Sequence, residues 1–143
     1  MRKFKNIVLS IVPLIIGGIL YLGYRSQELL MFRWVNFLGL SNIVSLWREF
    51  CFQHPLPGWC YYALPDGLWL LSYILLIYII WDSHTWKSII WIYALPTIAI
   101  TSELIQLLDS RFGTFDIMDI IGYMGAILLF ELKTKIEWKR KDI

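Results

Sequence analysis

Long stretches without charged residues constrain this chain more than any other feature. Residues 6–24 hold no charged side chain, and at 1.5 Å of rise per residue a helix over them is about 28 Å long. That length is close to the roughly 30 Å hydrocarbon core of a bilayer. Residues 67–81, 88–108 and 116–132 are three further apolar stretches. Because 58% of the residues are hydrophobic and only 17% are charged, a water-soluble enzyme is excluded. We therefore predict an all-α membrane protein with four transmembrane helices in a compact bundle.

The segment between the first two predicted spans differs in character from a span. Residues 28–50 are rich in Leu, Phe and Trp, but they include Arg48 and Glu49, which are costly at the centre of a bilayer. Gly39 and the Ser–Asn pair that follows it favour a break in the helix. We predict two short helices that lie in the membrane interface, with a fifth, kinked span as the alternative. Residues 133–143 are predicted to form a charged cytoplasmic tail, as the solvated end of the last helix.

The distribution of basic residues predicts the topology. With four spans, the two chain ends and the loop between the second and third spans carry 9 Lys and Arg residues, against 4 on the other side. Since loops rich in Lys and Arg stay in the cytoplasm, both termini are expected to be cytoplasmic. The basic start and the small size are typical of a multi-pass protein of the bacterial inner (cytoplasmic) membrane.

Polar side chains gather where the predicted spans reach the outer face. Glu103 and Gln106 lie one turn apart on one stripe of the third span. Asp119 lies one turn after Asp116, which is expected to cap the fourth helix. The second span begins on the same side, and the loop before the fourth span also lies there. We expect a shallow pocket lined by polar groups and two aromatic walls: Asp66, Trp69, Tyr73, Glu103, Gln106, Arg111, Asp116 and Asp119.

Three roles fit Arg111 in such a pocket. It could pair with Glu103 or Asp119, because an unpaired charge in a low-dielectric site is costly. It could instead hold a phosphate or carboxylate through forked hydrogen bonds. The third role is structural, in an ion-pair network that only ties the helix ends together.

Two interpretations of the cysteines stay open. Cys51 and Cys60 could form a disulfide in an oxidising compartment, or they could remain free thiols. Two cysteines are too few for a four-ligand zinc site, and the chain contains no nucleotide-binding or metal-protease motif. We therefore predict no metal and no cofactor. The net charge of +2 is too small for a nucleic-acid-binding surface.

The order of the polar residues resembles that in the VanZ-like family of small bacterial membrane proteins. The resemblance is carried by Glu103 and Gln106 one turn apart, by Arg111 in the next loop, and by Asp119 at the head of a Gly-rich final span. It covers roughly residues 62–132. It implies a role at the cell envelope, linked to resistance against glycopeptide antibiotics such as teicoplanin, and it implies no particular reaction.

We expect the pocket to bind a membrane lipid or a lipid-linked envelope precursor through an anionic or sugar-bearing head group. Other classes remain open: a membrane enzyme that uses Glu103 or Asp119 as general acid or base, a small proton-coupled transporter, or a structural subunit of a membrane complex. Whether a reaction is catalysed is left open by the residues. The residues also leave open whether the partner is a second copy of the chain or another membrane protein.

Overall fold

All regular structure in the described part of the chain is helical, which confirms the all-α prediction. The computed structural model describes residues 2–81 and 86–139; His84 and the end of the predicted tail lie outside the described residues. The elements are α1 (Arg2–Tyr24), α2 (Leu30–Phe37), α3 (Ser41–Gln53), α4 (Gly58–Tyr62), α5 (Leu64–Trp81), α6 (Trp86–Leu108), the 3₁₀-helix η1 (Ser110–Phe112) and α7 (Ile117–Lys139).

Three helical segments are long and apolar enough to cross a membrane. They are Ile7–Tyr24, Gly58–Trp81 and Trp86–Leu108. The second of them begins at Gly58 in α4, earlier than residue 67. Pro65 lies in the first turn of α5, a position at which proline is well tolerated in a helix. α7 has the length of a span but carries charged residues near both ends, and it is not among the three.

α7 extends beyond residue 132 into the charged tail, as expected for a tail that forms the end of the last helix. The helix continues to Lys139, so the first part of the predicted tail, residues 133–139, is helical. An ion pair between Lys133 Nζ and Glu137 Oε1, 3.1 Å apart and one turn from each other, stabilises this extension.

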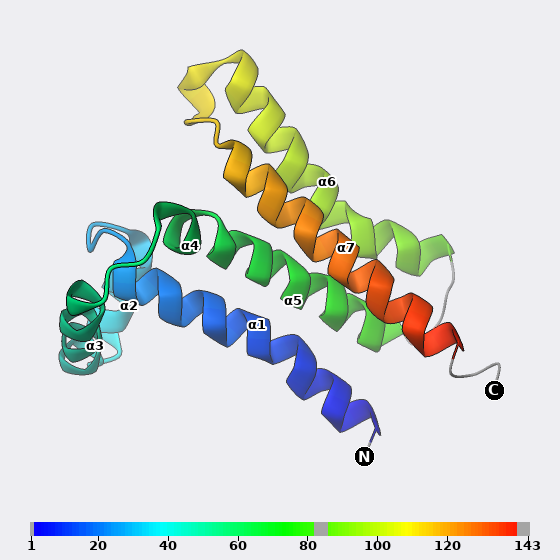
Figure 1. The fold of residues 1–143 in the computed structure, drawn as a ribbon, viewed down its shortest axis with the longest axis horizontal. Coiled ribbons are helices and arrows are strands. Elements are labelled where there is room, and N and C mark those ends of the chain that lie inside the picture. The colour runs from blue at the N-terminus through cyan, green and yellow to red at the C-terminus, as the bar shows by residue number, and fades with distance from the viewer. Residues whose placement is uncertain (1, 82–85, 140–143) are drawn as a thin grey trace.

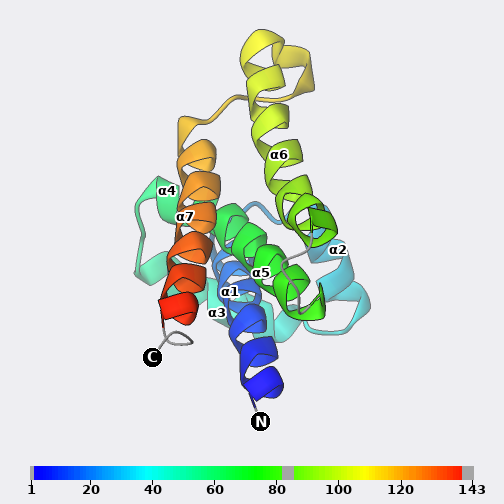
Figure 2. The same cartoon turned by 90° about the vertical axis from the view of Figure 1, so that its right-hand side faces the viewer.

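α5 is the helix around which the others are arranged. It packs against α1, α6 and α7, and it lies between α1 and α7 (Figure 1). Figure 2 shows the same helices from the side on which the two described chain ends lie. α1 and α6 run in one direction and α5 and α7 in the other. The start of α1 and the end of α7 therefore lie at one end of the molecule, and α2, α3, α4 and η1 lie at the other (Figure 1).

Apolar packing and one close backbone approach hold α5 against its neighbours. The buried cluster combines side chains of α5, α6 and α7: Leu70, Ile74, Leu75, Ile92, Ala126 and Phe130. Nearer the α4 end, α5 and α7 meet at Gly67 and Gly122. A Cβ atom on Gly67 would lie 2.9 Å from the carbonyl oxygen of Gly122, so the crossing requires a residue without a side chain.

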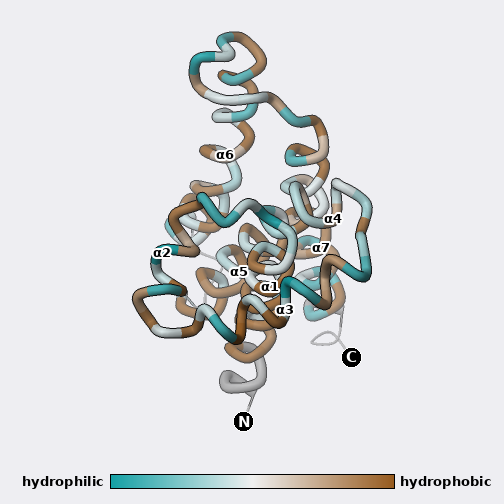
Figure 3. Tube along the Cα trace, turned by 90° about the vertical axis from the view of Figure 1, so that its left-hand side faces the viewer, coloured by the Kyte–Doolittle hydropathy of each residue, from teal (hydrophilic) through white to brown (hydrophobic). Residues whose placement is uncertain are grey.

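The segment between α1 and α4 forms two helices rather than one. Gly39, with a φ of 70°, separates α2 from α3. The Arg48 guanidinium donates to the carbonyl oxygens of Leu22 and Arg25 at 2.9 and 2.8 Å, and so satisfies acceptors at the end of α1. Hydrophilic and hydrophobic stretches alternate along this part of the chain (Figure 3). Both cysteines are free thiols; Cys51 is buried.

Candidate functional site

Acidic side chains from three helices approach one another at the α4 end of the molecule. Asp66 lies in the first turn of α5 and Asp119 in the first turn of α7, where the partial positive charge of the helix N-terminus favours a carboxylate. Glu103 comes from the last third of α6 and is only 5% exposed. Asp119 lies within electrostatic reach of both other carboxyl groups. We call Asp66, Glu103 and Asp119 the carboxylate cluster.

Asp116 links this cluster to the start of α7. Its side-chain Oδ1 accepts a hydrogen bond from the backbone N–H of Met118 at 2.8 Å, which confirms the capping role predicted for it. Its own backbone N–H donates to Glu103 Oε2 at 3.3 Å. The loop before α7 thus supplies the buried Glu103 with a donor.

The cation that faces the carboxylate cluster is Arg25, which the sequence analysis did not select. It follows the last residue of α1, and its charge acts on both Asp66 and Asp119. Its guanidinium lies over the ring of Tyr62, 4.8 Å from the centroid, and over that of Tyr21 at 5.4 Å. The two rings keep the guanidinium between α1 and α4, beside the acidic ends of α5 and α7.

One hydrogen-bond acceptor of the carboxylate cluster has no hydrogen-bond donor among the described residues. Asp119 Oδ1 is buried and has no hydrogen-bond partner among the described residues. A buried, unsatisfied oxygen is costly, so such an atom in a folded protein calls for an explanation. Tyr123, one turn further along α7, interacts electrostatically with the same three carboxylates and was also missed by the sequence analysis.

Arg111 lies outside the carboxylate cluster, in contrast to the pairing predicted for it. Its Nη2 is 2.6 Å from Asp109 Oδ2 and its Nε donates to Asp109 Oδ1 at 3.0 Å, and the side chain of Arg111 is 86% exposed. These hydrogen bonds hold the pKa of Asp109 below its usual range. The physical reason is proximity, since a carboxylate two residues away reaches the guanidinium before any carboxylate on another helix can.

Three other predicted pocket residues serve to join helices or to support a turn. The Trp69 indole donates to the carbonyl oxygen of Leu14 on α1 at 3.2 Å. The Tyr73 hydroxyl donates to the carbonyl oxygen of Trp91 on α6 at 2.6 Å. Gln106 packs against Gly113 in the loop after η1, where a Cβ atom would lie 2.9 Å from the amide carbon. The two aromatic side chains hold α5 between its neighbours.

Comparison with protein-family models, curated proteins and solved structures finds no match. Within the described residues, no three His, Cys, Asp or Glu side chains are grouped closely enough to hold a metal ion. The kind of ligand that the site can bind therefore follows from the atoms that it presents. It offers several hydrogen-bond acceptors, one guanidinium and flanking tyrosines, at the end where the apolar helical segments begin or end.

Proposed function

We propose that this protein crosses the bacterial cytoplasmic membrane four times and binds the sugar-bearing head group of a lipid or related amphiphile at the carboxylate cluster. α7 would be the fourth span. It is as long as α6, with 23 residues each, and residues 120–130 in its centre hold no charge. Four spans put both termini on one side, as expected from the basic residues and from the arrangement of the helices.

The observation that carries this proposal is the buried Asp119 Oδ1, which has no donor among the described residues. A hydroxyl group supplies the donor that such an oxygen needs, and a sugar presents several hydroxyl groups at once. Hydrogen bonds to an ionised acceptor are stronger than neutral ones, which favours retention of the ligand.

The charge of the site favours a sugar over an anion, although both were expected from the sequence. Carboxylates outnumber the single guanidinium of Arg25 among the groups that interact here. A phosphate would be repelled by Asp66 and Asp119, whereas a neutral hydroxylated group meets no such repulsion. Arg25 remains as a donor for a hydroxyl or ring oxygen of the same ligand.

The position of the carboxylate cluster, near the ends of the helices, agrees with a lipid head group as ligand. Asp66 and Asp119 lie in the first turns of their helices, and Glu103 lies five residues before the end of α6. Head groups occupy the boundary between the hydrocarbon core and water, where Tyr and Trp side chains are also enriched. Tyr21 and Tyr62 flank the site at this depth.

Binding of two probes that share a chain and differ in head group tests the proposal. Dodecyl maltoside and dodecyl phosphate are titrated onto protein held in amphipol, and bound molecules are counted by native mass spectrometry. We expect the maltoside to bind more tightly than the phosphate, and Asp119→Asn to weaken the maltoside about ten-fold, as the loss of a charge-assisted hydrogen bond predicts.

Asp109→Asn is the matched control, because it removes the same charge from a carboxylate bound by Arg111 outside the cluster. It should bind the maltoside like the wild type. Equal binding by Asp119→Asn and Asp109→Asn, or tighter binding of the phosphate, would overturn the proposal.

The resemblance to the VanZ-like family stays a prediction. It agrees with a ligand from the cell envelope and with a link to glycopeptide resistance, and no match to a family model supports it. The binding proposal rests on the carboxylate cluster and does not depend on the family.

A further inference from the structure

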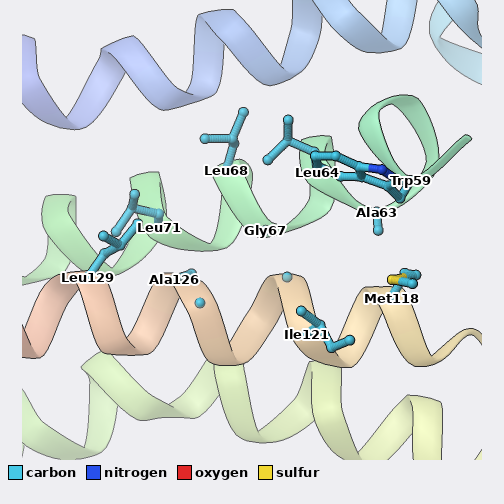
Figure 4. A pocket seen from close by; sticks show the side chains of 12 residues that line it. Trp59, Ala63, Leu64, Gly67, Leu68, Leu71, Met118, Ile121, Ala126 and Leu129 are labelled. Carbon is cyan, nitrogen blue, oxygen red and sulfur yellow. The ribbon is translucent and has the colours of Figure 1, made fainter. Parts of the chain in front are cut away.

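An apolar groove runs along the junction of α5 and α7. Figure 4 shows Trp59 and Met118 towards one end, Leu71 and Leu129 towards the other, and Gly67 between them. From Met118 to Leu129 the groove follows α7 for about 16 Å, at 1.5 Å of rise per residue. Its volume is about 250 Å³.

Glycine and alanine residues give the groove its depth. Gly67 and Gly122 bring the two backbones together at its floor. Gly125 and Ala126 continue this floor along α7, and a Cβ atom on Gly125 would meet nothing within 4 Å. No charged side chain lines the groove.

One end of the groove adjoins the carboxylate cluster. Asp66 precedes the lining residue Gly67, and Asp119 follows the lining residue Met118. Trp59 of α4 lies at the same end, and its indole suits the boundary between hydrocarbon and head groups. A polar site and an apolar groove therefore meet at one level of the molecule.

We propose that this groove holds the acyl chain of the amphiphile whose head group binds at the carboxylate cluster. The inference rests on the proposed function. It narrows the ligand to a glycolipid that has a single acyl chain or that places one of its chains in the groove. Its chain would lie along α7 from Met118 towards Leu129, while its hydroxyl groups reach Asp119.

The dimensions of the groove favour an acyl chain over a partner helix as its occupant. A helix with its side chains is 10–12 Å across, so a groove of about 250 Å³ admits only the tips of a helix's side chains. A hydrocarbon chain is flexible and can follow the junction along its full length.

Chain length tests the inference separately from the head group. Hexyl and dodecyl maltoside are titrated onto protein in amphipol, and bound molecules are counted by native mass spectrometry. We expect the dodecyl chain to improve binding at least ten-fold in the wild type, because each buried methylene contributes favourably. In Gly125→Leu, whose side chain would fill the groove, this improvement should disappear while hexyl maltoside binds as before.

Gly18→Leu is the matched control, because Gly18 is a helical glycine of α1 that also faces open space. It should keep the full dependence on chain length. Ile121→Trp, at another lining residue, serves as second variant if Gly125→Leu does not yield folded protein. Unchanged chain-length dependence in the folded variant would overturn the inference.

The two proposals fail in different ways. If Asp119→Asn abolishes hexyl maltoside binding while Gly125→Leu keeps the benefit of the longer chain, the head-group site stands and the groove inference is wrong. If Asp119→Asn binds hexyl maltoside like the wild type while Gly125→Leu loses the benefit of the longer chain, the groove holds the chain and the proposed head-group function is wrong.

Discussion

Asp109 and Arg111 form a closed pair at the tip of η1, away from the carboxylate cluster. The guanidinium binds both carboxylate oxygens of its neighbour, and the side chain of Arg111 faces solvent. Because Arg111 is already paired and exposed, it has no role in holding a ligand at Asp119, eight residues further along the chain. Arg25 is the basic residue whose removal should affect binding.

Arg111→Gln should therefore leave maltoside binding unchanged and raise the pKa of Asp109 back to its usual range, because the hydrogen bonds from Arg111 that lower it are lost. The pKa of Asp109 is lower in the folded protein than in the unfolded chain, so the pair stabilises the fold above the unfolded pKa. That contribution is lost as the pH falls through the lower, folded pKa. Between pH 5 and pH 8 the difference in stability between the variant and the wild type should not change with pH, which thermal unfolding of both in detergent at several pH values would check. Weaker maltoside binding would contradict this assignment.

At the same scale, the sequence predicted some site residues better than others. Asp66, Glu103 and Asp119 could be placed together because helix rise and span boundaries put all three at one membrane face. Arg25 could not, because its position depends on how α4 returns across the end of α1, and no spacing in the sequence encodes that. None of the three roles considered for Arg111 included Asp109, the carboxylate only two residues away with which it pairs.

At the scale of elements, the α5–α7 crossing depends on the absence of a side chain at Gly67. In Gly67→Val the new atoms would meet the backbone of Gly122 at about 3 Å or less, and backbone cannot move aside as a flexible side chain can. We expect a loss of about 1–3 kcal/mol in the free energy of unfolding. Steric trapping or thermal unfolding in detergent measures it.

Gly18→Val is the control for this crossing. It introduces the same side chain into a helix at a position with open space around it, so it carries the same change in helix propensity without the clash. A Gly67→Val variant as stable as Gly18→Val would show that the helices can separate at the crossing without cost.

Helix ends were harder to predict than helices. The uncharged stretches locate α1, α5, α6 and the centre of α7, because a run of apolar residues is visible in the sequence. The ends are set by local contacts instead. Pro65 fits into the first turn of α5, and the Lys133–Glu137 ion pair extends α7 into the charged tail. Neither contact can be recognised from the hydropathy of the segment in which it lies.

For the whole molecule, an even number of spans is the prediction that decides the topology. With α7 as fourth span, alkaline phosphatase inserted after Gly113 should be active, because it reaches the oxidising side of the membrane. The same enzyme fused to the C-terminus should be inactive, and a fluorescent protein there should fold. An active C-terminal phosphatase would instead indicate three spans, with α7 on the outer surface.

The arrangement of helices around α5 was not predictable from the sequence, since each apolar helix is compatible with several neighbours. It follows from side chains that find acceptors on other helices. Ser72 donates to the carbonyl oxygen of Ser10 on α1 at 2.6 Å, and Tyr73 donates to α6. Such pairs specify neighbours because a donor left in lipid without an acceptor is costly.

The order in which the helices leave the ribosome has a consequence for the carboxylate cluster. Asp116, Asp119 and Tyr123 belong to the last helix and its cap, so synthesis delivers them after Asp66 and Glu103. A chain that stops before residue 116 leaves the Glu103 carboxylate without the backbone N–H of Asp116 and leaves the face of α5 around Gly67 uncovered. The carboxylate cluster therefore closes only after α7 has been synthesised and has packed against α5 and α6.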